Sequence, residues 1–110
     1  MTTFVLINNT SDLSGEQERP RKLLKKRLSV QKISGIFFYS EAVNGLLNEV
    51  RLNEWLEYSL SEGIPLYVCR NSLIKRNISG EINPAINVVG LGQLIEGVLN
   101  SKKTIVIGDL

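Results

Sequence analysis

Hydrophobic residues along this chain fall into five short runs separated by polar stretches. The runs are TFVLIN (3–8), ISGIFFY (33–39), PLYVC (65–69), INVVG (86–90) and TIVIG (104–108). They are continuous rather than alternating, and they are rich in Val, Ile, Phe and Tyr, which is typical of strands covered on both faces. The pattern therefore predicts five buried strands.

The stretches between the runs carry apolar residues at helical spacing. Helices are predicted over about 20–29, about 49–62, a short segment after Cys69 and about 92–101. Pro20 suits the first turn of the first helix, and Gly63 is a suitable C-cap for the second. The residues expected to face the core from the second helix are Leu52, Trp55, Leu56 and Leu60.

Strands that alternate with helices predict an α/β fold with a parallel sheet. We expect a single domain over residues 1–110, an open sheet of five parallel strands with helices on both faces, in the flavodoxin-like order 2-1-3-4-5. Sites in such sheets lie beyond the carboxyl ends of the strands, where the strand order switches direction. In the predicted order this switch falls between the first and third strands, so Asn8 and Asn9 would lie in one crevice with Cys69.

Composition narrows the classes of function. No apolar run approaches the roughly 20 residues of a membrane span, and the N-terminus lacks a secretory signal pattern, so the expected location is cytoplasmic. The chain has one cysteine and no histidine. These counts exclude an intramolecular disulfide and leave too few soft ligands for a self-contained zinc or iron–sulfur site. We expect neither a metal nor a cofactor.

The net charge of +2 hides an uneven distribution. Residues 1–40 carry seven basic and three acidic side chains, and all seven basic ones lie in segment 19–32. No aromatic residue lies between these basic residues, which weakens a role in binding single-stranded nucleic acid. A solvated helix face is the preferred interpretation, and the role of this segment is left open.

Cys69 is the main candidate for chemistry, because it stands where an apolar run ends and a basic helical segment begins. A helix N-terminus and nearby cations such as Arg70 favour the thiolate, which is the nucleophilic form of the side chain. A Cys-His mechanism is excluded because the chain has no histidine. Sulfur transfer through a persulfide and redox exchange with a partner thiol remain, beside a purely structural role for a small apolar residue.

Two further segments contain candidate site residues. VVGLGQL (88–94) places Gly90 and Gly92 between a strand and a helix, without the third glycine of a dinucleotide fingerprint. A tight turn with close backbone approach is the preferred interpretation, and anion binding is the second. In FFYSEAV (37–43), Tyr39 and Glu41 leave the second strand, where packing and helix capping explain them adequately.

GIFFYSEAV, EGIPLYVCRNSLIKRN and VVGLGQLIEGVLNSKKTIVIGD together resemble the DsrE-like sulfur-relay family, in its DsrE/TusD branch, over most of residues 33–108. The resemblance implies a cytoplasmic sulfurtransferase subunit whose cysteine, here Cys69, accepts sulfane sulfur as a persulfide from a donor carrier protein. It then passes this sulfur to a small cysteine-bearing acceptor protein. The resemblance also implies assembly with two sibling subunits into a heterohexamer. The pathway would be 2-thiolation of the tRNA wobble uridine or dissimilatory sulfur oxidation.

Some positions depart from the family pattern. Arg70 and Asn71 follow the cysteine where small residues are usual, and Val89 stands where serine often precedes G-L-G. A non-catalytic structural or interaction subunit of the same complex is an alternative, which the resemblance implies through sister subunits that lack the cysteine. Flavin or nucleotide binding is weaker, because no phosphate loop follows the first strand. The residues expected to support Cys69 are Arg70, Asn8, Asn9, Tyr39, Gly90 and Gly92.

The sequence also predicts an oligomer that contacts neither nucleic acid nor membrane directly. Trp55, Tyr58 and the apolar triplet 45–47 suggest more apolar surface than a domain of this size covers alone.

Overall fold

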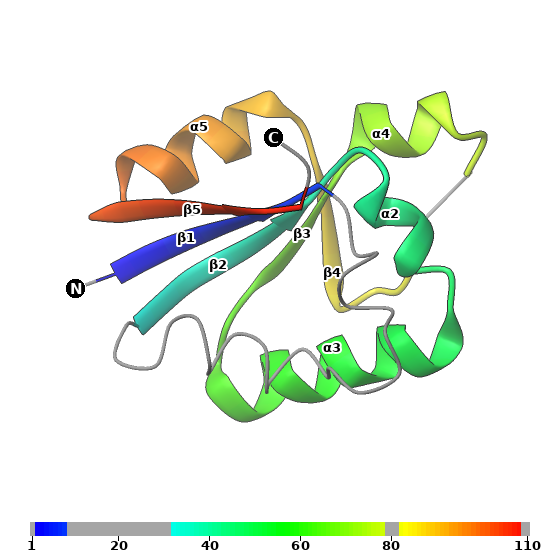
Figure 1. The fold of residues 1–110 in the computed structure, drawn as a ribbon, viewed down its shortest axis with the longest axis horizontal. Coiled ribbons are helices and arrows are strands. Elements are labelled where there is room, and N and C mark those ends of the chain that lie inside the picture. The colour runs from blue at the N-terminus through cyan, green and yellow to red at the C-terminus, as the bar shows by residue number, and fades with distance from the viewer. Residues whose placement is uncertain (1, 9–31, 79–81, 109–110) are drawn as a thin grey trace.

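The computed structural model describes residues 2–8, 32–78 and 82–108, which form a parallel sheet with helices on both sides (Figure 1). The strands are β1 (Thr2–Ile7), β2 (Lys32–Phe38), β3 (Leu66–Cys69), β4 (Ile86–Val89) and β5 (Lys103–Ile107). The helices are α2 (Ala42–Gly45), α3 (Glu49–Glu62), α4 (Arg70–Lys75) and α5 (Leu91–Leu99). The α/β class and the parallel sheet are confirmed. The helix predicted over 20–29 and the basic segment 19–32 lie outside the described residues.

The strand order is β4-β3-β2-β1-β5. This is a flavodoxin-like arrangement. It differs from the predicted order 2-1-3-4-5 in one respect: β2 lies between β1 and β3, whereas the predicted order has β1 between β2 and β3. After β1 the chain adds β2, β3 and β4 in succession on one side, and α5 then returns the chain to place β5 on the other side of β1. Because all five apolar runs resemble strands covered on both faces, their composition gave no signal for which strands are neighbours.

The larger core lies between the sheet and the helices α2 and α3. Trp55 is the centre of the α3 contact, and its ring meets Phe38 edge to face at a centroid distance of 5.0 Å. The helix begins after Asn48, whose side chain accepts a hydrogen bond from the backbone N–H of Arg51. It ends at Gly63, which adopts the left-handed conformation with φ 66° and confirms the predicted C-cap.

One of the α3 residues that were expected to face the core faces solvent instead. Leu60 is 88% exposed, whereas Tyr58 is buried beside Trp55. At about 100° per residue, Leu60 lies roughly 140° around the helix from Trp55, while Tyr58 lies only about 60° away. None of the helices in the described ranges is long and apolar enough to cross a membrane.

The opposite side of the sheet is covered, within the described residues, by α5. Its half-buried Leu94 and Val98 pack over a small cluster formed by Phe4, Phe37 and Cys69. Helix α5 approaches β1 closely at Gly97, where an added Cβ would lie 2.5 Å from ring atoms of Phe4. Glycine is therefore required at this position by contact rather than by backbone conformation.

Candidate functional site

The candidate site lies at the carboxyl ends of β3 and β4. Helix α4, which follows β3, packs Leu73 into the α3-side core, whereas α5, which follows β4, packs Leu94 onto the other side. Neighbouring parallel strands whose helices leave to opposite sides define the topological switch point of such a sheet. Cys69 ends β3 as predicted and is the register partner of Val89 on β4. The switch point is thus between β3 and β4, not between β1 and β3.

The Cys69 side chain lies in apolar surroundings. The residue is 9% exposed and clusters with Phe4 and Phe37. The half-buried apolar residues packed around this cluster are Leu6, Tyr39, Tyr67, Val89, Leu94 and Val98. Cys69 has extended backbone angles as the N-cap of α4, and its side chain makes no capping hydrogen bond. The arrangement keeps the sulfur largely away from solvent without committing it to a polar partner in the described part of the chain.

Tyr39 separates Asn8 from Cys69 along the carboxyl edge of the sheet. The register pairs Ile7 with Phe38 and Phe38 with Val68, so the next residues on the three strands lie in one row: Asn8, Tyr39 and Cys69. The amide Nδ2 of Asn8 donates a hydrogen bond to the Tyr39 hydroxyl at 3.2 Å. The expected direct neighbourhood of Asn8 and Cys69 is wrong because β2 lies between their strands. Asn9 lies outside the described residues.

Arg70 and the two glycines of the downstream turn also lie at this edge. Arg70 is exposed, and its guanidinium Nη2 donates to the backbone carbonyl of Val88 at 3.4 Å, toward β4. Gly90 is the N-cap of α5, and Gly92 lies in its first turn. The expectation of close backbone approach at these glycines is wrong, because a Cβ at either position would meet nothing within 4 Å.

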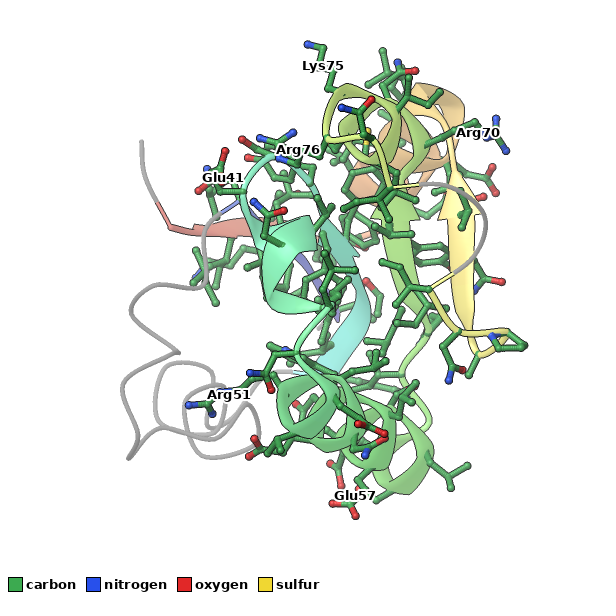
Figure 2. All side chains as sticks on the ribbon, turned by 90° about the vertical axis from the view of Figure 1, so that its right-hand side faces the viewer. Glu41, Arg51, Glu57, Arg70, Lys75 and Arg76 are labelled. Atoms are coloured by element: carbon green, nitrogen blue, oxygen red, sulfur yellow. The ribbon has the colours of Figure 1, made fainter. Side chains whose placement is uncertain are left out.

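Sequence reasoning missed a polar connection that fixes α4. The Ser72 hydroxyl accepts a hydrogen bond from the backbone N–H of Ser40 at 2.9 Å, and Arg76 Nη2 forms an ion pair with Glu41 at 2.8 Å. Arg76 also donates through Nη1 to the carbonyl of Ser72 at 3.3 Å. We call Ser40, Glu41, Ser72 and Arg76 the α4 clasp; Figure 2 labels Glu41 and Arg76.

The clasp joins the turn after β2 to the helix that follows Cys69. Its charged pair holds the pKa of Glu41 below the usual value, through the hydrogen bond and the charge of Arg76 and then through a hydrogen bond from Asn44. Ser40 has a φ of 55°, which is uncommon for a residue with a side chain. The available sequence signal was the spacing of four between Ser72 and Arg76, which places both on one face of a helix.

Comparison with known proteins identifies the family. A family model described as the DsrE/DsrF-like family matches residues 1–107. The chain belongs to the DsrE/DsrF-like family. The recognition of a DsrE-like chain from its strand-terminal cysteine and G-L-G-Q-L turn is therefore confirmed.

Two individual proteins illustrate what this DsrE/DsrF-like chain is similar to. A protein of Allochromatium vinosum named "Putative sulfurtransferase DsrE" is 28% identical over 101 residues, covering 71% of this chain and 75% of the relative. The crystal structure of the ychN protein from E. coli superposes with a TM-score of 0.67 at 18% identity, covering 97% of this chain and all of that chain. This second likeness shows a shared fold.

The geometry limits what this DsrE/DsrF-like site can do. Its free thiol lies in an apolar setting, at the end of a strand and beside a helix held in place by the clasp. Chemistry that needs only a sulfur nucleophile suits such a site, because exchange between a thiolate and a sulfur–sulfur bond requires no second catalytic group. No histidine in the chain is available as a general base.

Proposed function

We propose that this chain is a sulfurtransferase subunit of the DsrE/TusD branch that carries sulfane sulfur as a persulfide on Cys69. The observation that carries the proposal is the placement of the chain's one cysteine at the switch point of the sheet, inside an apolar cluster. Family membership and the name of the A. vinosum relative support the sulfur chemistry.

The reaction requires two displacements at sulfur. In the first, the Cys69 thiolate attacks the outer sulfur of a donor protein persulfide, the donor S–S bond breaks, and the donor cysteine leaves as a thiolate. In the second, an acceptor thiolate attacks the outer sulfur of the Cys69 persulfide, and Cys69 leaves as a thiolate. No net oxidation occurs, because sulfane sulfur only changes carriers. The apolar cluster limits competing oxidation and reduction between the two steps.

The proposed pathway is 2-thiolation of the tRNA wobble uridine in the cytoplasm, in which this subunit contacts proteins rather than RNA. This follows from the resemblance to the DsrE/TusD branch. Dissimilatory sulfur oxidation is the alternative pathway, and the same chemistry at Cys69 serves both. A non-catalytic subunit of the same kind of complex is the alternative that the experiment below separates.

We propose assembly with sibling DsrE-like subunits, supported by the outward side of α5. Ile95 and Leu99 lie four residues apart along this helix, and each is more than half exposed. Patches of this kind mark interfaces more often than free surface. Trp55 and Tyr58, which suggested an apolar surface from the sequence, are instead buried in the core.

The test is sulfur loading of wild type and Cys69→Ser. The chain is incubated with a persulfide donor, and its intact mass is measured before and after reduction. Wild type should gain one or more sulfur atoms and lose them on reduction, whereas Cys69→Ser should gain none and keep its circular dichroism spectrum. If assembled wild type stays unloaded by a donor that loads another thiol protein, the chain is a structural subunit.

A further inference from the structure

The outward side of α4 combines positive charge with an aliphatic residue immediately after Cys69. At about 100° per residue, the buried residues Ser72 and Leu73 lie on one side of the helix. The exposed residues span the other side, and Leu91, the exposed first residue of α5, lies at the same edge of the sheet. We call this set the α4 outer face: Arg70, Asn71, Ile74, Lys75 and Leu91.

Within the described ranges, the two cations of this face have no acidic partner. Arg76 is paired with Glu41, but neither Arg70 nor Lys75 has a carboxylate within ion-pair distance among residues 2–8, 32–78 and 82–108. Helix α4 itself carries no acidic residue, whereas α3 carries Glu49, Glu54, Glu57 and Glu62 against a single Arg51. Figure 2 shows Lys75 and Arg70 near α4, at one end of the molecule, and Glu57 at the other.

We propose that the protein exchanging sulfur with Cys69 docks on the α4 outer face through a thiol-bearing segment rich in Asp and Glu. Acidic side chains of that segment meet Arg70 and Lys75, and an aliphatic side chain meets Ile74, which is 63% exposed. Opposite charge steers the encounter and orients the segment, while the aliphatic contact retains it. The inference rests on the proposed function, and it specifies the chemistry of the partner.

The composition of the face favours a protein segment over nucleic acid. A strand of RNA would require several cations along its backbone and aromatic side chains for stacking. The α4 outer face has two cations and two large aliphatic residues, and no aromatic residue belongs to it. A transfer through this face follows the second displacement above: the docked thiolate takes the outer sulfur, and Cys69 leaves as a thiolate.

The experiment uses two synthetic thiol peptides of equal length. One has a central cysteine flanked by aspartates and one leucine, and the other has lysines in place of the aspartates. Persulfide-loaded protein is mixed with each peptide, and the transfer rate per peptide thiolate is measured by mass spectrometry at low salt and at about 1 M salt. We expect the acidic peptide to react about tenfold faster at low salt, with the difference lost at high salt.

Charge-reversal variants locate the effect. Arg70→Glu/Lys75→Glu should invert the preference toward the lysine peptide. The matched control is Lys102→Glu/Lys103→Glu, which reverses two exposed lysines at the start of β5, at the opposite end of the sheet, and should keep the wild-type preference. Equal rates for the two peptides at low salt, or an equal change in the control, would overturn the docking proposal.

Failure of this proposal is distinguishable from failure of the proposed function. Protein that never loads with a small-molecule persulfide donor argues against the sulfurtransferase itself. Protein that loads normally but shows no peptide preference leaves that function intact and removes only the docking face. A short single-stranded RNA that blocks the acidic peptide through Arg70 and Lys75 would assign the face to nucleic acid instead and overturn the inference.

Discussion

The two sides of the sheet are built differently. The α3 side buries a large aromatic and aliphatic core under α2 and α3, centred on Trp55 and Phe38. The α5 side has one helix over a small cluster, and α5 has no fully buried residue of its own. Cys69 belongs to this smaller cluster.

The two sides of the sheet should contribute to different properties of the protein, one to its stability and the other to the reactivity of Cys69. Removing apolar area from water dominates folding free energy, so the α3 side should carry most of the stability of the described domain. The α5 side has less area to bury, and its contacts decide mainly how accessible the Cys69 sulfur is. Variants on the two sides should therefore change different measured quantities.

Trp55→Ala should have the largest effect on stability. It removes the aromatic ring at the centre of the α3 side, and we expect the free energy of unfolding to fall by about 3–5 kcal/mol. Urea denaturation followed by circular dichroism measures this change. Leu60→Ala on the same helix, where the side chain is exposed, should stay within about 0.5 kcal/mol. Equal losses for the two variants would contradict the assignment of the core.

Gly97→Ala should have an intermediate effect and expose the sulfur. The added Cβ would overlap the Phe4 ring, so α5 must shift, and we expect a loss of about 1–3 kcal/mol. Alkylation of Cys69 by iodoacetamide under native conditions should become faster. Gly92→Ala, on the same helix in open space, is the control and should leave the alkylation rate unchanged. An unchanged rate in Gly97→Ala would mean that α5 does not shield the thiol.

The smallest expected effect concerns the α4 clasp and its dependence on pH. Because the pKa of Glu41 is lowered in the folded chain, its ion pair with Arg76 stabilises the fold above the ordinary carboxyl value of 4.5. This contribution is lost as the pH falls through the lowered folded-state pKa. Thermal unfolding should show a small stability difference between wild type and Glu41→Gln at neutral pH.

The thermal stabilities of wild type and Glu41→Gln should become equal at acid pH, where the Glu41 carboxylate is protonated. Glu57→Gln, which removes an exposed carboxylate on α3, controls for the change in net charge. A difference between wild type and Glu41→Gln that grows on acidification would show that the clasp does not stabilise the folded state through the ionised carboxylate.

The boundaries of the main helix were predictable from the sequence, whereas the order of the strands in the sheet was not. Helix α3 begins and ends within the range expected from its periodicity, because Asn48 and Gly63 supply caps that depend on a few adjacent residues. The short α2 lacks such a pattern and was not predicted. The strand order depends on how the crossovers pack, and the uniform apolar runs carry no signal for it.

In the candidate site, too, features set by adjacent residues were predictable, and features set by residues far apart in the sequence were not. Cys69 was predictable as a strand-end residue because a change from apolar to polar sequence marks it. The role of Gly97 was not, since its requirement comes from Phe4, which lies far away along the chain. The α4 clasp was missed for the same reason, because Glu41 and Arg76 belong to different crossovers.

The position of β1 between β2 and β5 has a consequence for the order of folding during synthesis. Thr3 on β1 pairs with Lys103 on β5, so β1 cannot complete its pairing until β5 has been made. At roughly 5–20 residues per second, a ribosome needs about 5–20 seconds to make the intervening chain. The helix that covers Cys69 lies in this late portion. A nascent chain therefore carries its one thiol without its α5 cover until Leu91–Leu99 has been made, and only then is the apolar shelter complete.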